Sequence, residues 1–128
     1  MSDLLQGFAI SADGLRAQAM RLRHLSENIA NVDTPGYRRK LTTFEPAALD
    51  GGASVRLGPE RLDPGELPRI FAPGHPMADA TGYYDGSNVN IVIELADARE
   101  AQRSYEANLR MFDQSRQMAR DLIELLKR

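Results

Sequence analysis

The sequence predicts a mainly α-helical chain, in which long N- and C-terminal helices pair as a coiled coil and an irregular middle carries short β-hairpin structure. All 7 Pro and 8 of the 10 Gly residues lie between residues 35 and 86. Apolar residues recur every seven positions at both ends of the chain. Pro and Gly disfavour helix interiors, and a sustained seven-residue repeat is typical of coiled coils. The two ends are therefore expected to be helical and the middle irregular.

The first predicted helix covers residues 3–32. One apolar row has seven-residue spacing: Phe8, Leu15, Leu22 and Ile29. A second row, four positions later in each cycle, is mostly small and would permit close approach of another helix: Leu5, Ala12, Ala19 and Ser26. Gly7 and Gly14 each cost about 1 kcal/mol in a helix interior. The residue before Pro35 disfavours the α conformation, so the helix should end at or before Thr34.

The second predicted helix covers residues 91–127, with Asn90 or Asn88 as its N-cap and Glu94 in the first turn, where the helix dipole favours a negative charge. One heptad row contains Ile91, Ala98, Tyr105, Phe112, Ala119 and Leu126. Its partner row contains Leu95, Gln102, Leu109, Arg116 and Ile123. Further apolar residues widen this seam near the C-terminus: Met111, Met118, Leu122 and Leu125. A rod of about 37 residues would be roughly 55 Å long.

The middle segment contains turn-forming sequences throughout, among them Asp50-Gly51-Gly52 and Asp85-Gly86. Short stretches between the turns are compatible with β-structure: residues 40–44, 54–57, 68–71 and 82–84. We expect a small hairpin with extended arms and no independent core. The predicted organisation is one helical core domain, residues 1–34 with 89–128, and one Pro/Gly-rich insertion, residues 35–88.

Composition argues against several classes of protein. The 16 Lys and Arg residues face 18 Asp and Glu residues, so the chain lacks the basic field of a nucleic-acid binder. The absence of Cys excludes disulfides, thiol nucleophiles and Cys-ligated metals. No apolar run approaches the length of a membrane span, and the first residues lack the basic segment of a secretory signal. We expect neither nucleic-acid binding nor membrane insertion.

Candidate catalytic and metal-binding residues are weak. The nearest carboxylate pairs, Asp63/Glu66 and Asp79/Asp85, lie on Pro/Gly-rich loops, where solvated acidic side chains are the favoured interpretation. His24 is expected on a polar or interface surface of the first helix, and His75 is expected to serve a turn. Because no cluster has metal-ligand spacing, the sequence predicts no metal, no cofactor and no enzymatic activity.

Two helices around a long irregular segment leave a monomer with a poor core, so folding is expected to complete on assembly. The isolated monomer is then expected to show low helicity and disordered termini.

Residues 26–37, Ser-Glu-Asn-Ile-Ala-Asn-Val-Asp-Thr-Pro-Gly-Tyr, resemble the N-terminal signature of the bacterial flagellar axial proteins, which include rod, hook and hook-associated proteins. In this segment Asn28 and Asn31 can cap or cross-link the backbone near the helix end. Pro35-Gly36 suits a turn with positive φ at the glycine, and Tyr37 can anchor the departing chain.

Three further segments are similar to the FlgC-type family of proximal-rod proteins: residues 73–83, 88–90 and 103–108. The compact chain after the Thr-Pro-Gly-Tyr turn is shared with the sister FlgB-type rod proteins, which remain an alternative. A soluble helical binding module, such as an export chaperone, is the alternative from a different class.

The resemblance implies a structural subunit of the proximal rod, which polymerises helically and transmits torque from the motor. It implies as partners further copies of itself, the FlgB, FlgF and FlgG types of rod protein, the adaptor FliE, the MS ring and, during secretion, the export apparatus. It also implies a place in the periplasm-spanning rod of the basal body, reached by export without a cleaved signal peptide.

The residues expected at assembly interfaces form three groups. The helix seams are expected to bury within and between subunits, while the turn at residues 33–37 and the loop at residues 73–83 are expected to contact neighbours. The candidate residues are Phe8, Leu15, Leu22, Asn28, Ile29, Asn31, Thr34, Pro35, Gly36, Tyr37, Pro73, His75, Pro76, Tyr83, Asn90, Tyr105, Asn108, Leu109, Phe112 and Ile123.

Overall fold

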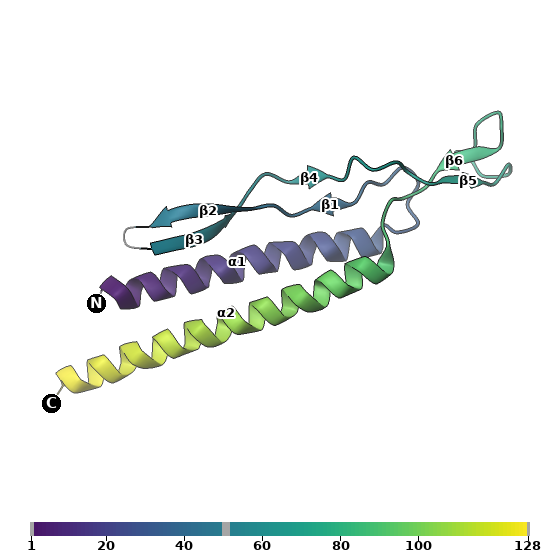
Figure 1. The fold of residues 1–128 in the computed structure, drawn as a ribbon. Coiled ribbons are helices and arrows are strands. Elements are labelled where there is room, and N and C mark those ends of the chain that lie inside the picture. Colours follow the sequence, from purple (N-terminus) through teal and green to yellow (C-terminus); the bar gives the residue numbers. More distant parts are fainter. Residues whose placement is uncertain (1, 50–51, 128) are drawn as a thin grey trace.

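Two long antiparallel helices run side by side in the computed structural model, which describes residues 2–49 and 52–127 (Figure 1). Helix α1 spans Ser2–Ala30 and helix α2 spans Ile91–Leu126. Three two-stranded antiparallel pairs lie between them in the sequence. The predicted class, mainly α with a short β middle, is confirmed.

A long, interrupted β-ribbon follows α1. Strand β1 (Lys40–Leu41) pairs with β4 (Arg61–Leu62), and β2 (Phe44–Leu49) pairs with β3 (Gly52–Leu57). This ribbon, residues 40–49 and 52–62, lies along α1 on the side away from α2 (Figure 1). The predicted turn at residues 50–51 lies outside the described residues.

Strand β2 was predicted only at its first residue, because the stretch that follows contains Pro46. In the structure Pro46 lies opposite Val55 of β3. Both strands of a two-stranded ribbon are edge strands, where a residue without an N–H is tolerated. The missing donor therefore does not prevent the strand from forming.

A second hairpin projects beyond the end of the helix pair. Strand β5 (Arg69–Phe71) pairs with β6 (Tyr83–Asp85), which confirms the predicted β-capable stretches at residues 68–71 and 82–84. We call residues 68–86 the arm. Figure 1 shows it extending past the junction at which α1 ends and α2 begins.

The helix ends are set by local hydrogen bonds. Helix α1 ends at Ala30, two residues before the predicted end, and a turn begins in which the Asn31 N–H donates to Glu27 O over 3.1 Å. Helix α2 begins at Ile91 as predicted, because Asn90 Oδ1 accepts a hydrogen bond from Val92 N over 3.0 Å.

The two helices approach each other along rows of small and polar residues. The row on α1 is Gly7, Gly14, Arg21 and Asn28, and the row on α2 is Glu94, Ala101, Asn108 and Ser115. A Cβ atom added at Gly14 would overlap the Asn108 side chain, and one added at Gly7 would lie 3.3 Å from Ser115 Oγ. The close approach that the small row was expected to permit occurs instead along the glycine row, since Ala19 and Ser26 are exposed.

The core is thin. Among the described residues the buried apolar side chains are Ala17, Leu25 and Ala101. Buried polar residues are more numerous, and they are Ser11, His24, Asn28, Ser54, Ser87 and Glu94. Specific polar contacts therefore contribute much of what fixes this fold, and two of these residues, Asn28 and Glu94, meet where α1 ends and α2 begins.

Candidate assembly interface

Asn28 links four segments of the chain at the end of α1. Its fully buried side chain donates from Nδ2 to Lys40 O over 3.0 Å and to Glu94 Oε2 over 3.3 Å. Its Oδ1 accepts hydrogen bonds from Lys40 N over 2.8 Å and from the Tyr37 hydroxyl over 2.9 Å. Both donors and the acceptor oxygen are thus satisfied. The predicted role of Asn28 in cross-linking backbone near the helix end is confirmed.

Glu94 is a fully buried carboxylate on the first turn of α2. Arg39 Nε donates to Glu94 Oε1 over 2.7 Å, and the same guanidinium lies 3.6 Å from Asp63 and 3.9 Å from Asp97. A buried charge is tolerated when a partner of opposite charge and further hydrogen bonds compensate its desolvation. We call this cluster, Asn28, Arg39 and Glu94 with their contacts, the polar junction.

The turn between α1 and β1 is tied internally and to the arm. Asn31 Nδ2 donates to Glu27 O over 2.7 Å, and the Thr34 hydroxyl donates to Asn31 Oδ1 over 3.0 Å. Gly36 has a φ of +73°, as predicted, and its N–H donates to Asp85 O over 3.0 Å. Tyr37 follows with its hydroxyl on Asn28, which confirms its predicted anchoring role. Burial raises the pKa of Tyr37 above its ordinary value.

Charged side chains continue the junction toward the ribbon. Lys40 Nζ lies 2.6 Å from Glu27 Oε2 and 3.6 Å from Glu60 Oε1. The hydrogen bond from Lys40 lowers the pKa of Glu27, and the same bond raises the pKa of Lys40. His24 is buried against the ribbon, with Nδ1 2.6 Å from Thr42 Oγ1 and Nε2 3.5 Å from Glu60 Oε2.

The loop at residues 73–83 is organised around Asp79. Its carboxylate accepts hydrogen bonds from Thr81 N, the Thr81 hydroxyl and Tyr83 N, and it pairs with Arg69 over 2.7 Å. These donors, the Thr81 hydroxyl foremost, hold the pKa of Asp79 far below its usual range. His75 serves the turn, as predicted, because its Nδ1 accepts from Met77 N over 3.0 Å.

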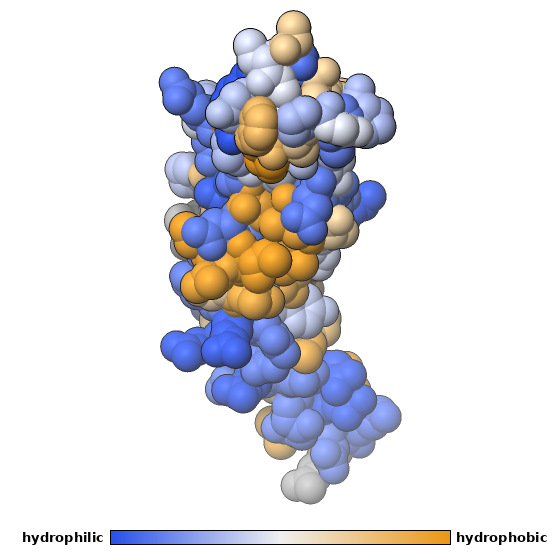
Figure 2. All heavy atoms as spheres, turned by 90° about the vertical axis from the view of Figure 1, so that its right-hand side faces the viewer, coloured by the Kyte–Doolittle hydropathy of each residue, from blue (hydrophilic) through white to orange (hydrophobic). Residues whose placement is uncertain are grey.

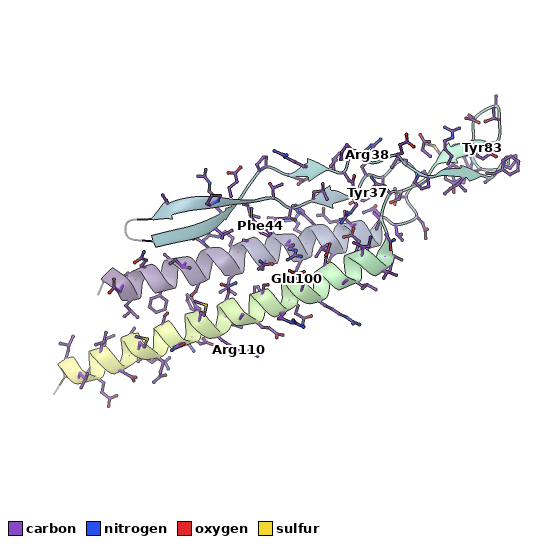
Figure 3. The ribbon with its side chains drawn as sticks, in the orientation of Figure 1. Tyr37, Arg38, Phe44, Tyr83, Glu100 and Arg110 are labelled. Atoms are coloured by element: carbon purple, nitrogen blue, oxygen red, sulfur yellow. The ribbon has the colours of Figure 1, made fainter. Side chains whose placement is uncertain are left out.

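The arm exposes apolar and aromatic side chains. Figure 3 shows Tyr83 far from Tyr37 and Arg38, beyond the helix ends. The rings of Phe71 and Tyr83 pack with centroids 5.0 Å apart, and both side chains remain exposed. Met77 and Ile70 are exposed beside them. Pro73 and Pro76, in the same loop, are exposed as well.

The predicted seam residues divide between the interior and the surface. Phe8 and Phe112 meet edge to face with centroids 5.2 Å apart. The half-buried members are Leu15, Leu22, Ile29 and Tyr105. Asn108 packs against Gly14 and donates to Ser104 O. Leu109 and Ile123 are 40% and 55% exposed, so α1 does not cover the second predicted row of α2.

Sequence reasoning missed Arg39 and Lys40. It placed Glu94 at the helix dipole and among the acidic residues expected to pair between helices, but it did not single it out as a buried carboxylate. A signal was present, since Glu94, Ala101, Asn108 and Ser115 are seven residues apart. This row contains one charged residue among small ones, which indicates a close helix contact ending in a paired charge. The apolar rows beside it are more conspicuous in the sequence, and the helix contact was predicted from them instead.

Three of the four acidic side chains in the candidate pairs contact an arginine. Arg69 lies between Asp79 and Asp85 and pairs with both, and Asp63 pairs with Arg39. Within residues 2–49 and 52–127 no group of three or more His, Cys, Asp or Glu residues is arranged to hold a metal ion. Neither helix of the described chain is long and apolar enough to cross a membrane.

Comparison with known proteins agrees with the geometry. A family model described as "Flagella basal body rod protein" matches residues 8–38, which hold most of α1 and the turn after it. A second, described as "Flagellar basal body rod FlgEFG protein C-terminal", matches residues 80–125. The two models therefore cover most of both helices and two members of the polar junction, Asn28 and Glu94.

Curated relatives match nearly the whole chain. The flagellar basal-body rod protein FlgC of Agrobacterium fabrum is 43% identical, with 99% of this chain and 98% of the relative covered. FlgC of Escherichia coli O6:H1 is 35% identical over 90% of this chain and 92% of the relative. FlgC of Borreliella burgdorferi is 32% identical over 97% of this chain and 98% of the relative. These names favour the FlgC type over the sister FlgB type, and the chain belongs to the FlgC family of flagellar basal-body rod proteins.

Proposed function

We propose that the chain is a subunit of the proximal rod, which polymerises helically with copies of itself and with other rod proteins and transmits torque from the motor. As a FlgC-family protein it is a structural subunit of the flagellar basal body and assembles with other rod proteins. The refinement to the proximal rod and to torque transmission rests on the resemblance of its motifs.

One observation supports this role above the others. Helix α2 exposes large apolar side chains in two groups. One lies in its first two turns, Ile91, Val92, Ile93 and Leu95, and the other in its C-terminal half, Leu109, Met111, Met118, Leu122, Ile123, Leu125 and Leu126. Exposed apolar surface of this kind marks protein interfaces. An assembled rod would cover both groups.

The interface assignments follow the same physical argument. We assign the exposed seam residues, Leu109 and Ile123 among them, to contacts between subunits, and the half-buried ones to contacts within the subunit. The turn at residues 33–37 and the loop at residues 73–83 are assigned to neighbouring subunits. The helical unit of residues 1–34 with 89–128 would form the inner part of the rod, and residues 35–88 the outer part.

The finer partners are proposals of the same kind. They are the FlgB, FlgF and FlgG types of rod protein, the adaptor FliE, the MS ring and the export apparatus. We propose export without a cleaved signal peptide, which a chain without Cys would favour because no disulfide can form before it is threaded unfolded. We assign the chain no catalytic activity, since its relatives are rod proteins.

Leu109→Asp tests the proposed function. Leu109 is exposed in the subunit, so the substitution should leave synthesis intact but block rod assembly and swimming by placing a charge in an apolar contact. Gln114→Asp adds the same charge at an exposed polar position of α2 and should swim normally. Normal swimming by the Leu109→Asp strain would count strongly against the interface assignment. Recovery of the chain in a soluble cytoplasmic oligomer, and not in basal bodies, would favour the chaperone alternative.

A further inference from the structure

Helix α2 continues past the start of α1. Asn28 faces Glu94, Gly14 faces Asn108 and Gly7 faces Ser115, so every step toward the N-terminus of α1 is matched by a step toward the C-terminus of α2. In this register Ser2 falls opposite about residue 120, by equal rise per residue in both helices. We call residues 121–126 of α2 the overhang. Figure 1 shows this end of α2 extending past the N-terminal end of α1.

The overhang carries four exposed aliphatic side chains beside the charged Asp121 and Glu124. They are Leu122, Ile123, Leu125 and Leu126, and the exposure of Leu126 reaches 84%. An isolated helical segment of two turns is unstable in water, and helices in proteins owe most of their stability to packing of an apolar face. The overhang therefore needs a contact that the described part of this subunit does not supply.

A matching surface lies at the opposite end of the same helix. Ile91, Val92, Ile93 and Leu95 are exposed, with Val92 75% exposed. We call these four residues the head patch, and Figure 2 shows hydrophobic residues gathered at this end of the molecule. The charged residue among them, Glu94, is turned into the polar junction and fully buried. The head patch is therefore an aliphatic surface without an exposed charge of its own.

We propose that the overhang of one rod subunit docks on the head patch of the next, so that subunits join head to tail. The occupant is an adjoining rod subunit that carries the same C-terminal segment. This inference rests on the proposed function, since it identifies which surfaces of the rod subunit meet. The family model named for FlgE, FlgF and FlgG proteins matches residues 80–125 and so spans the head patch and most of the overhang.

The geometry of the two surfaces favours a polymer. They are different surfaces at opposite ends of one molecule, so each contact leaves one of each kind free. Such head-to-tail contacts extend into open helical assemblies unless they close into a ring. Successive α2 helices would point the same way, which brings the negative end of one helix dipole toward the positive end of the next.

The proposed contact between overhang and head patch is small, so it should bind weakly in isolation. Stable interfaces bury about 800 Å² per partner, and smaller ones bind weakly by themselves. Four aliphatic residues on each side are expected to hold only when lateral contacts in the rod bring the two ends together. The experiment therefore has to be made in the assembled basal body.

The test places a photo-crosslinking amino acid at Leu126, and in a second strain at Val92, in the bacterium that makes this chain. After irradiation, basal bodies are isolated and the crosslinked peptides are identified by mass spectrometry. The Leu126 probe should reach the first two turns of the last helix of a neighbouring rod protein. The Val92 probe should reach the last two turns of another. A probe at Gln114, exposed in the middle of α2, should reach neither.

The outcomes separate the inference from the proposed function. Adducts at the predicted ends support the head-to-tail contact, whichever rod protein carries the crosslinked segment. If the strains swim and the chain is present in basal bodies, but both probes crosslink elsewhere, the head-to-tail contact is wrong and the rod function stands. Absence of the chain from basal bodies of swimming cells would overturn both.

Discussion

The two helices of this subunit have similar lengths and opposite surroundings. Helix α1 lies between the ribbon on one side and α2 on the other, and most of its side chains are at least partly covered. Helix α2 has only α1 as a long neighbour and exposes apolar side chains along its outer face. Helix α1 thus belongs to the interior of the subunit, whereas α2 is left open on one side and is the helix that we propose to be covered in the assembled rod.

The helix pair is also asymmetric along its length. At one end the polar junction joins α1, α2 and the ribbon through hydrogen bonds to Asn28 and Glu94. At the other end the overhang has no partner on α1. Stability should therefore fall from the polar junction toward the chain ends, and four experiments test this expectation.

The largest expected effect follows from removing the partner of the buried carboxylate. Arg39→Met leaves Glu94 buried without its cation, which typically costs about 3–5 kcal/mol. We expect a large loss of the helical circular dichroism signal and a lower urea midpoint. Arg38→Met is the matched control, because Arg38 only donates to backbone carbonyls of the Asp63–Gly65 loop. Equal losses in the two variants would contradict the central role of the junction.

The second experiment compares the two glycines of the close helix contact. Gly14→Ala drives a methyl group into Asn108, and overpacking of this kind costs about 1–3 kcal/mol. Gly7→Ala meets only Ser115 Oγ at 3.3 Å, so the gain in helix propensity, about 1 kcal/mol, should offset the crowding. Urea unfolding should show the first variant destabilised and the second unchanged or stabilised. Adding Asn108→Ala to the Gly14→Ala variant should partly restore its stability. Failure to do so would argue against direct contact between residue 14 and the Asn108 side chain.

The third experiment follows the gradient along α2 in the isolated monomer. Amide hydrogen exchange should be slowest near Glu94 and fast from about residue 110 onward, because the outer half of α2 lacks apolar cover. The helicity of the monomer should accordingly be lower than two complete helices would give. Uniformly slow amide exchange along α2, together with full helicity of the monomer, would contradict the expectation that folding completes on assembly.

The smallest effect concerns pH. The lowered pKa values of Asp79 and Glu27 mean that each carboxylate contributes stability above its ordinary pKa of about 4. This contribution is lost as the pH falls through the lowered folded-state value. As the pH falls below about 4, we expect the amide signals at the end of α1 around Glu27 to move first. The signals of Thr81 and Tyr83 should move only at still lower pH, because the pKa of Asp79 is lowered much further. Asp79→Asn should abolish the movement in the arm, and an unchanged pH response in that variant would assign it to another group.

Local patterns accounted for much of the fold. The heptad rows predicted both helices, Asn90 predicted the start of α2, and the Asn-Ile-Ala-Asn and Thr-Pro-Gly-Tyr segment predicted the turn with positive φ at Gly36. These features depend on residues close together in the sequence, whose conformational preferences are strong. The strand at Pro46 was missed because its tolerance depends on the partner strand.

The helix faces could not be assigned from the chain alone. The apolar rows of α1 and α2 suggested one shared seam, but the closest contact runs through Gly7 and Gly14, with Asn28 and Glu94 at its end. Seven-residue spacing is a property of several rows on each helix, and it does not say which row faces the partner. That choice depends on how closely two backbones can approach and on which buried charges find partners.

The sequence alone accounted for the two helices, the N-cap of the second, the irregular middle and the motif of the flagellar axial proteins, because each is set by neighbours within a few turns of chain. Only the tertiary structure decided that Glu94 is buried with Arg39 and Asn28, that the ribbon covers α1, and that α2 is left open on its outer face. These outcomes depend on segments up to 66 residues apart, such as Asn28 and Glu94. Burial, strand and helix register and the pairing of charges arise from contacts between distant segments, so the local preferences of the sequence do not specify them.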